Sequence, residues 1–288
     1  MIDETLDIKH RALEHRISQL GSLVVAYSGG VDSALLAYVT QKTIGGRCLA
    51  VLADSPSLSR NEYDAAVAFA LEHSINLRVI KTDELDNPEY KRNGADRCFY
   101  CKQELFAVLE QIRVQQGYTA VAYGKNTDDA NDIRPGARAA GLYEVVAPLA
   151  ESGLNKEDVR ELARLAGLHL WDKPASACLA SRIEYGRPVT REALKAVEQA
   201  EAGLHRLGFS QCRVRHHGEI ARIEIAQNEM SRVFEHGMVS QIVLTIKQAG
   251  FHFVALDLEG YRSGSMNTLL PPEALLIKKD QSTKPEFL

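Results

Sequence analysis

The sequence has no long apolar run, no large excess of either charge and few cysteines. No apolar stretch in its 288 residues reaches the length of a membrane-spanning helix, so we expect no membrane span. Its 34 Lys and Arg against 38 Asp and Glu give a formal net charge of −4, which offers no bulk electrostatic reason to expect nucleic acid as a partner. Residues 1–4 are acidic and lack a signal-peptide pattern, so we expect a cytoplasmic protein.

Five cysteines in a cytoplasmic chain do not indicate a disulfide framework. Cys48 and Cys212 lie inside strand-like runs, where a cysteine packs as a small core residue. Cys98 and Cys101 form a C-x-x-C motif at the start of a predicted helix, a position that lowers the thiol pKa and suits a metal or a redox pair. Cys178 lies in a stretch of small residues without periodicity, which predicts a loop held close to another group. For Cys178, a core position, a metal site and a nucleophile all stay open.

The apolar fraction of 45% is enough for a hydrophobic core. Apolar runs typical of buried strands alternate with amphipathic stretches typical of helices, and this order predicts a doubly wound parallel α/β sheet. A composition shift near residues 185–188 predicts a hinge. We therefore predict an α/β domain over 1–184, a smaller α+β domain over 185–270 and a loosely ordered tail over 271–288. Strands are predicted at 23–26, 47–52, 77–80, 120–123, 145–149, 212–215, 220–225 and 251–256, and helices at 3–20, 60–73, 99–115, 191–207 and 237–249.

The most informative stretch is the turn Ser-Gly-Gly-Val-Asp-Ser between the first strand and the helix that follows it. Gly29 and Gly30 allow a sharp turn and a close approach to a phosphate. Ser28 and Ser33 add hydroxyl donors at a helix start, where free N–H groups favour an anion. Asp32 would repel a phosphate, so we expect it to act through a Mg²⁺ ion that joins it to the phosphates. The Gly-Lys-Ser/Thr ending of a Walker loop is missing, which excludes that class of site.

Small polar and acidic residues follow two other predicted strands. Asp54 ends the second strand, and Gly124, Asn126 and Asp128 follow the fourth. In a doubly wound sheet the carboxyl ends of neighbouring strands border the ligand crevice, so we expect these residues to line it. Arg134, further along the same loop, is a candidate phosphate ligand. A solvated loop is the alternative for these charges.

Two patterns mark the smaller unit. Glu201 interrupts the apolar stripe of its predicted helix, where a carboxylate is costly unless it is paired or bound to something. Alternation places Arg213 and Arg215 on one side of a strand, and Arg222 with Glu224 on one side of the next strand. Exposed strand faces often carry such charges, so a solvated face and a ligand-binding face both stay open.

Together these pieces resemble the LarE family of ATP-dependent sulfur transferases, whose pyrophosphate loop is shared with GMP synthetases, NAD synthetases and tRNA thiolases. The resemblance covers about residues 10–270. Its more specific parts are the Cys-Leu-Ala-Ser-Arg stretch that begins at Cys178 and the Arg-Val-Arg strand that begins at Arg213. It implies a PP-loop ATP pyrophosphatase domain with a small C-terminal domain, often in a homo-oligomer. The pieces that carry it are 28–33, 54–56, 124–129, 134–136, 177–186, 213–215 and 221–224.

The resemblance implies an enzyme that uses ATP and Mg²⁺ to adenylate and thiolate the carboxylates of pyridinium-3,5-biscarboxylic acid mononucleotide, for the nickel-pincer nucleotide cofactor. Arg213 and Arg215 suit a substrate with a phosphate and two carboxylates, since guanidinium forks pair with both groups. Arg182 and Glu224 are further substrate-side candidates. Glu201 is a candidate metal ligand or contact with another subunit. We expect ATP to lie against Ser28, Gly29, Gly30, Asp32, Ser33, Asp54, Gly124, Asn126 and Asp128.

One branch of the family gives up the sulfur of a single cysteine and is left with dehydroalanine, and Cys178 matches that position. Here Cys98 and Cys101 accompany it, and three cysteines resemble the branch that holds a [4Fe-4S] cluster by three thiolates, with one iron free to carry a hydrosulfide. We therefore expect the three cysteines to converge on one cluster beside the ATP site, fed by sulfide or a sulfur donor. A Zn²⁺ ion on the same thiolates, and loss of the Cys178 sulfur, are the alternatives.

Two other functions stay open. The loop also resembles that of cluster-bearing enzymes that thiolate a tRNA base, although the sequence has no dense Lys/Arg stripe or aromatic platform for RNA. The second alternative is that the chain is not an enzyme. It would then bind ATP and a cluster as a sensor, or carry sulfur as an adaptor. Salt-sensitive binding of tRNA would favour the first alternative. ATP that stays intact in the presence of substrate and sulfide would favour the second.

Overall fold

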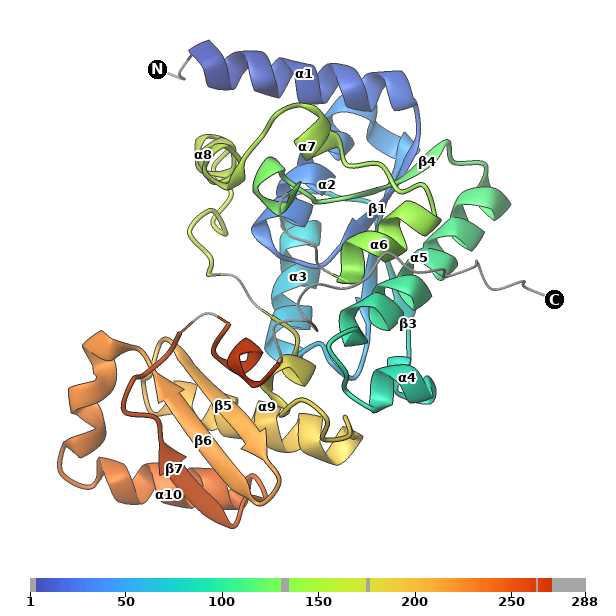
Figure 1. The fold of residues 1–288 in the computed structure, drawn as a ribbon. Coiled ribbons are helices and arrows are strands. Elements are labelled where there is room, and N and C mark those ends of the chain that lie inside the picture. The colour runs from blue at the N-terminus through green and yellow to red at the C-terminus, as the bar shows by residue number, and fades with distance from the viewer. Residues whose placement is uncertain (1–3, 131–134, 175–176, 263, 271–288) are drawn as a thin grey trace.

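The larger of two sheets forms the centre of the fold. The computed structural model describes residues 4–130, 135–174, 177–262 and 264–270. Four parallel strands lie in the order β3-β2-β1-β4 (Figure 1). They are β1 (Leu23–Tyr27), β2 (Cys48–Asp54), β3 (Leu77–Lys81) and β4 (Ala120–Tyr123). The chain moves outward from β1 to β3 and then returns to the other side of β1 for β4, so the direction of winding reverses between β1 and β4. This confirms the predicted doubly wound α/β fold.

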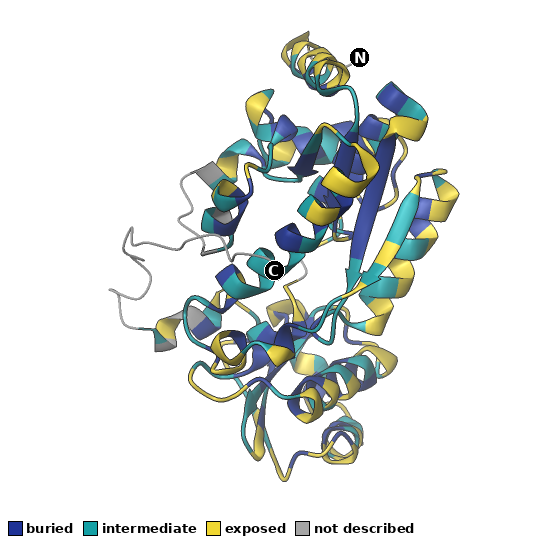
Figure 2. Cartoon of the chain, turned by 90° about the vertical axis from the view of Figure 1, so that its right-hand side faces the viewer, coloured by how far each residue is buried: buried dark blue, intermediate teal, exposed yellow. Residues whose placement is uncertain are grey.

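Helices cover both faces of this sheet. Alternate residues of β1 point to opposite faces, and all five are buried, as expected for a strand between two helical layers. Figure 2 shows buried inner strands between more exposed helices, whereas the edge strand β3 is half-buried or exposed. On one face lie α1 (Glu4–Leu20), α2 (Val31–Ile44), α3 (Arg60–Glu72) and α8 (Lys156–Leu165). On the other face lie α5 (Arg97–Gln116) and α6 (Pro135–Leu142).

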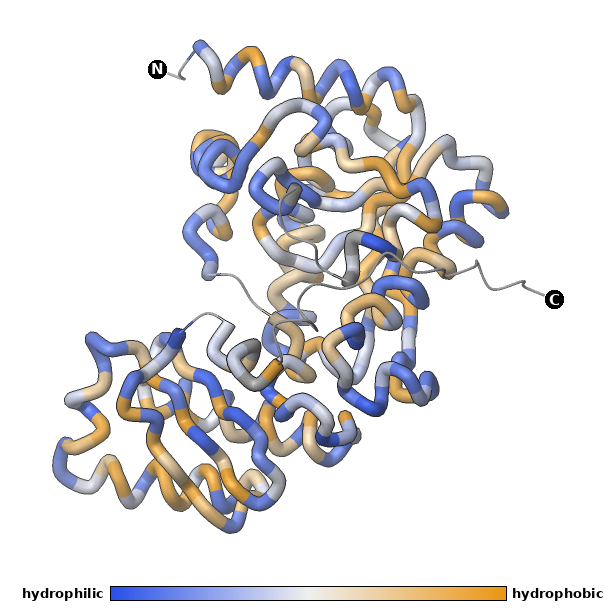
Figure 3. The backbone as a smooth tube through the Cα atoms, viewed as in Figure 1, coloured by the Kyte–Doolittle hydropathy of each residue, from blue (hydrophilic) through white to orange (hydrophobic). Residues whose placement is uncertain are grey.

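The smaller sheet has the strand order β5-β6-β7, with the first pair antiparallel and the second parallel. One face of this sheet packs against two helices, and the other carries charged side chains. The alternation of polar and apolar positions along β5 and β6 is visible in Figure 3. The elements are α9 (Arg191–Arg206), β5 (Cys212–His217), β6 (Ile220–Ile225), η5 (Gln227–Phe234), α10 (Met238–Gln248), β7 (Phe253–Leu256) and η6 (Ser265–Leu269).

The two sheets are connected through a shared apolar core. Leu85 and Tyr90, from the segment between β3 and α5, pack with the residues of α9 and β5. Tyr90 belongs to the short helix α4 (Pro88–Lys91), which follows η2 (Glu84–Asp86). Across the predicted hinge, Gly186 N–H donates to the Asn93 carbonyl at 3.1 Å and Val189 N–H to the Lys91 carbonyl at 2.9 Å. The boundary between 184 and 185 stays a prediction.

One predicted strand is wrong. Over 145–149 only Val146 pairs, in a single parallel bridge with Ala122 of β4. Pro148 begins the short helix α7 (Pro148–Glu151), because proline has no N–H for a sheet and is favoured at the first helical turn. The predictions for Arg134 and for the tail over 271–288 lie outside the described residues.

Candidate active site

The Gly-rich turn lies between the carboxyl end of β1 and the start of α2. Gly29 has a φ of +73°, and a Cβ built there would lie 2.7 Å from the Cβ of Ala66 on α3, so only glycine fits without strain. Gly30 is the N-cap of α2. The hydroxyl of Ser33 accepts from the Ser28 N–H at 3.1 Å and donates to the Gly30 carbonyl at 3.0 Å. These bonds fix the shape of the turn. Ser28, at its beginning, is exposed to solvent.

Asp32, in the first turn of α2, is held from two other segments. Its Oδ1 accepts from Asn126 Nδ2 at 3.0 Å, and its Oδ2 pairs with Lys156 Nζ. Gly124 lets the end of β4 approach closely, because a Cβ there would lie 2.7 Å from the Ser33 nitrogen. Asn126 is buried, and its own Oδ1 accepts from the Asp128 N–H at 3.0 Å. The ends of β1 and β4 therefore meet at the point where the winding of the sheet reverses, which is where α/β sheets bind ligands.

Lys156 is a site residue that the sequence reasoning missed. It is the first residue of α8, and its N–H donates to Asp128 Oδ2 at 3.0 Å. Asn155 and Asp158 form a capping box at this helix start. A lysine in the first turn opposes the helix dipole, so its position after an N-cap was the signal that an anion is bound nearby.

Lys173 is a second cation that the sequence reasoning missed. Its Nζ donates to the Gly29 carbonyl at 3.3 Å and to Glu62 Oε2 at 2.5 Å. Glu62 lies in the first turn of α3, so Lys173 connects the Gly-rich turn to that helix. Two ammonium groups therefore flank a loop whose helix start already favours an anion.

Asp54 lies in a neighbouring cavity of about 490 Å³. Its Oδ1 pairs with Arg60 of α3 at 2.7 Å. The cavity lies between the ends of β2 and β3 and the helix α9, where Arg191 and Lys195 line it. Asp54 thus reaches the crevice side of the sheet, as predicted for a residue at a strand end, and its contact with ATP stays a proposal.

The three candidate cysteines come from two segments that buried polar contacts hold together. Cys98 and Cys101 lie in the first turns of α5, and Cys178 precedes the short helix η4 (Leu179–Arg182). Arg97, buried at the start of α5, donates to the Ala180 carbonyl at 2.9 Å and also bonds Asn93 Oδ1. Cys98 and Cys178 are exposed, and Cys101 is half-buried.

Asn93 strengthens this connection. Its Nδ2 donates to the carbonyls of Ile183, Glu184 and Arg187 at 3.3, 2.9 and 3.0 Å. Its φ of +58° is uncommon for a residue with a side chain, and asparagine is among those that tolerate it best. One buried amide therefore anchors the segment after Cys178 against the start of α5.

The charge of a neighbouring thiolate affects the pKa of Cys98 and of Cys101. Although Cys98 as a residue is exposed, protein atoms around its thiol shield it from water and raise its pKa. The Cys178 thiolate raises the pKa of Cys98 further, while Arg97 partly offsets this. Burial also raises the pKa of Cys101, as do Glu84, Cys178 and Cys98. Burial would lower the pKa of Arg97, but the Cys178 and Cys98 thiolates raise it above its ordinary value. Cys98 and Cys101 therefore each lie within electrostatic reach of Cys178, and a cation beside them would oppose the increase of their pKa values.

The spacing of these sulfurs bears on the kind of metal site. Ligands that share one tetrahedral Zn²⁺ at 2.3 Å lie about 3.8 Å apart. Among the described residues, the three cysteines are not a group whose ligand atoms all lie within 4.8 Å of one another. A cubane binds each thiolate at a different iron, which needs a wider spacing. In this structure, therefore, the three cysteines do not already have the close spacing that a single tetrahedral Zn²⁺ needs.

Arg182 and Glu201 form a buried pair beneath the Cys178 loop. Arg182 donates to Glu201 Oε1 at 3.0 Å and to the carbonyls of Ala177 and Cys178 at 2.6 and 3.1 Å. Glu201 Oε1 also accepts from the Val214 N–H at 3.0 Å. The carboxylate in the apolar stripe of α9 is thus paired, and Arg182 supports the loop that carries Cys178.

Arg215 and Glu224 form a second buried pair, on the charged face of the smaller sheet. Their atoms Nη2 and Oε2 lie 2.6 Å apart, and Ser265 Oγ donates to Glu224 at 2.7 Å. The Nε of Arg215 is buried without a hydrogen-bond partner among the described residues. Arg213 stacks over Tyr261 at 5.3 Å, and burial together with the charge of Arg182 lowers its pKa. This face therefore has an unused donor and two neighbouring cations, which an anionic ligand would satisfy.

Comparisons with known proteins identify the family of the chain. A family profile described as NAD synthase matches residues 7–96. An uncharacterised protein of Synechocystis sp. is 40% identical over 92% of this chain and 99% of its own length. The pyridinium-3,5-bisthiocarboxylic acid mononucleotide synthase of Lactiplantibacillus plantarum is 35% identical over 92% of this chain and 96% of its own length. An uncharacterised protein of Methanocaldococcus jannaschii is 31% identical over 84% and 91%. The chain therefore belongs to the LarE family of ATP-dependent sulfur transferases, the family of the L. plantarum synthase.

Proposed function

We propose that this chain adenylates a carboxylate of pyridinium-3,5-biscarboxylic acid mononucleotide with ATP and then converts it to a thiocarboxylate. The observation that carries the proposal is the position of Asp32, between Asn126 and Lys156 at the switch point of the sheet. The substrate class rests on the likeness to the L. plantarum synthase, whose name describes the bisthiocarboxylic acid product.

In the first step, a carboxylate oxygen of the substrate attacks the α-phosphorus of ATP, and pyrophosphate leaves with the electrons of the broken P–O bond. The N–H groups at the start of α2, with Lys156 and Lys173, stabilise the charge that develops on pyrophosphate. Asp32 would hold the Mg²⁺ that neutralises the phosphates. Ser28, Ser33 and Asp128 border the same loop ends.

In the second step, a sulfide sulfur attacks the acyl carbon and AMP leaves with the electrons of the C–O bond, which yields the thiocarboxylate. Cys98, Cys101 and Cys178 would hold a [4Fe-4S] cluster that supplies the sulfur when it is bound. Arg213 and Arg215 bind the substrate phosphate or its second carboxylate, and Glu224 orients Arg215. Arg182 positions the Cys178 loop through its two carbonyl contacts.

The setting of the reaction is also part of the proposal. We expect a homo-oligomer in the cytoplasm, fed by sulfide or a sulfur donor. Among the described residues, no helix is long and apolar enough to cross a membrane.

The test of the first step is an Asp32→Ala variant, assayed for pyrophosphate release from ATP in the presence of substrate. We expect release to be lost, because Asp32 is the carboxylate that holds the metal. Asp64→Ala, which removes an exposed carboxylate from α3, is the matched control and should keep full activity. Adenylation of substrate by Asp32→Ala at the unmodified rate would overturn the proposal.

The test of the second step replaces each of the three cysteines by alanine, with iron content and turnover measured anaerobically. All three replacements should lower iron and activity together. Full activity in Cys98→Ala would contradict the cluster. A mass loss of one H₂S at Cys178 after a single turnover would instead show that Cys178 is the sulfur donor.

A further inference from the structure

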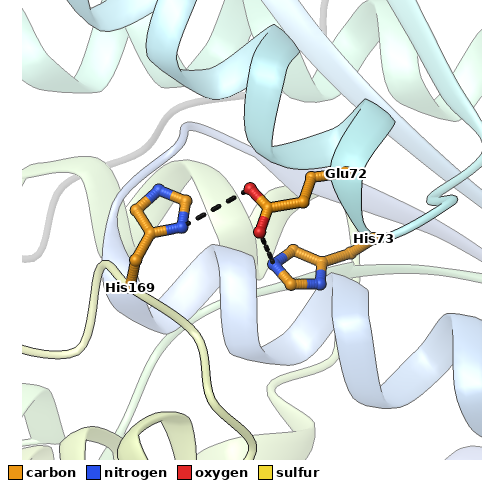
Figure 4. A group of neighbouring side chains, drawn as sticks. All are labelled: Glu72, His73 and His169. Carbon is orange, nitrogen blue, oxygen red and sulfur yellow. Dashed lines mark ion pairs between the residues drawn. The ribbon is translucent and has the colours of Figure 1, made fainter.

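A group of three side chains away from the nucleotide loop is arranged like a metal site. Among the described residues, one set of three His, Cys, Asp or Glu side chains has all its ligand atoms within 4.8 Å of one another: Glu72, His73 and His169. Figure 4 shows the Glu72 carboxylate between the two imidazole rings, with a different carboxylate oxygen facing each ring. Glu72 and His73 end α3, and His169 lies in the segment after α8.

The distances match those between ligands of one tetrahedral ion. His73 Nε2 lies 3.8 Å from Glu72 Oε1, and His169 Nδ1 lies 3.6 Å from Glu72 Oε2. Both distances are too long for a hydrogen bond. Nitrogen and oxygen ligands bind Zn²⁺ at 2.0–2.2 Å, so in a tetrahedral site they lie roughly 3.3–3.6 Å apart. Small side-chain rotations would therefore bring the three atoms onto one ion.

The end of α3 is shaped for this arrangement. Consecutive residues of a helix point in different directions, but His73 is the C-cap, with φ −97° and ψ 12°, so its ring leaves the helical direction and turns toward Glu72. The carboxyl end of a helix favours a cation through its dipole. The position of His73 at the C-cap and the dipole of α3 thus both favour a cation at the end of this helix.

The His73 ring is held in place while one of its nitrogens stays unused. The ring lies edge-on to Tyr38, with centroids 5.5 Å apart, and against Phe69, with centroids 4.5 Å apart. Phe69 also contacts the His169 ring at 5.8 Å. The Nε2 of His73 is buried and has no hydrogen-bond partner among the described residues. A buried nitrogen without a partner is costly, and a metal ion at the centre of the group would satisfy it.

We propose that Glu72, His73 and His169 bind one divalent transition-metal ion, with water completing the coordination. Two imidazoles and a carboxylate suit Zn²⁺ and the neighbouring first-row ions, and suit Mg²⁺ poorly, because Mg²⁺ prefers oxygen ligands only. The ion joins the end of α3 to the segment that carries Lys173, four residues after His169. Lys173 contacts Glu62 at the start of the same helix, so the ion and Lys173 fix this segment at both ends of α3. The site is independent of the proposed reaction.

The experiment measures Zn²⁺ binding to the full chain in a Cys98→Ala, Cys101→Ala, Cys178→Ala background, so that the thiols do not compete. We expect one equivalent of Zn²⁺, at least tenfold weaker after His169→Ala, which changes an exposed side chain. Glu72→Gln should also weaken binding. His236→Ala removes another exposed histidine outside the group and should leave the affinity unchanged. Failure of the background variant to bind Zn²⁺, or unchanged affinity in His169→Ala, would overturn the site.

A second measurement does not depend on removal of the cysteines. In the unmodified chain, diethyl pyrocarbonate should modify His169 readily without metal and slowly with Zn²⁺ present, as read from the modified peptide by mass spectrometry. His236 should react equally in both conditions. Equal modification of His169 with and without Zn²⁺ would contradict the proposal even if the cysteine-free variant does not fold.

Discussion

The ammonium group of Lys156 pairs with the carboxylate of Asp32, 124 residues earlier in the chain. The Lys156 ammonium group thereby lies beside Asp32, at the position where we expect Mg²⁺ to bind. In the proposed mechanism, Mg²⁺ would replace the ammonium group beside Asp32, and Lys156 would then be free to pair with the phosphates of ATP. We therefore expect Lys156 to act both in the free chain and in catalysis.

We predict that Lys156→Met lowers kcat/KM for pyrophosphate release by roughly 10- to 100-fold, which corresponds to about 1.4–3 kcal/mol of transition-state stabilisation. Lys156→Arg should recover part of the activity, since it keeps the charge. Lys247→Met, at an exposed position on α10, is the control. Steady-state kinetics with varied ATP would measure the effect, and an unchanged kcat/KM in Lys156→Met would remove Lys156 from the mechanism.

A second prediction concerns Arg97, whose charge acts on the Cys98 thiol and whose hydrogen bonds hold the two cysteine segments together. Arg97→Met should lower the iron content of anaerobically prepared protein while all three cysteines stay in place, because the Ala180 carbonyl loses its donor. The buried carbonyl left without a partner should also cost about 1–3 kcal/mol of folding stability. Arg113→Met, which breaks a pair with Glu110 on the same helix, tests whether any lost arginine on α5 has this effect. Wild-type iron content in Arg97→Met would show that the anchor is unnecessary.

The third prediction tests the backbone of the Gly-rich turn. Gly29→Ala requires a left-handed conformation at a residue with a Cβ, which costs about 1–2 kcal/mol, and brings that Cβ within 2.7 Å of the Ala66 Cβ. We expect a clear loss of stability in urea unfolding together with a loss of ATP binding. Adding Ala66→Gly should restore part of the stability, since it removes the overlap but not the backbone strain. Gly153→Ala, at a similar φ of +73° with open space around it, isolates the backbone contribution. Equal losses in Gly29→Ala and Gly153→Ala would mean that the Ala66 contact is unimportant.

The fourth prediction follows from the two buried cysteines. Burial raises the pKa of Cys48 and of Cys212 to about 12, and Glu201 adds to the effect at Cys212. An unfolded thiol titrates near pH 8.5, so between about pH 9 and 12 the folded chain binds more protons than the unfolded chain, and stability falls as pH rises. The loss at pH 11 is roughly 3 kcal/mol for each thiol as an upper bound. Below pH 8 both thiols stay protonated in both states and add no pH dependence.

The measurement is the urea midpoint of cluster-free protein between pH 7 and 11. Cys48→Ala should flatten the alkaline fall, because the buried Cys48 thiol then no longer contributes to it. An alkaline fall that is the same with and without Cys48 would show that this thiol does not titrate in the unfolding transition.

The sequence predicted those parts of the fold that depend on residues close together in the chain. The buried run of β1 and the Gly-rich turn each follow from residues within a few positions of one another. The smaller sheet was also predicted, because its strands alternate in polarity. The strand over 145–149 was wrong, because its apolar composition suited a sheet while Pro148 did not.

The candidate site was harder to predict where it depends on distant pairs. Nothing near Lys173 in the sequence shows that its ammonium group reaches the Gly29 carbonyl, 144 residues away. The pairing of Arg182 with Glu201 was equally hidden, although the misplaced carboxylate on α9 did indicate that a partner was needed. The histidine at 169 carried no motif, since its neighbours Glu72 and His73 are almost a hundred residues earlier.

The amide of Asn93 has a consequence for how the molecule unfolds. This side chain spans the junction between the two sheets, with one end on Arg97 and the other on three carbonyls of the segment before α9. The core around Tyr90 continues the same junction into the smaller sheet. Because opening either unit at this point would break these bonds, we expect the two sheets to unfold in one cooperative transition. The Cys178 loop, which lies at the junction, therefore keeps its position for as long as the whole chain stays folded.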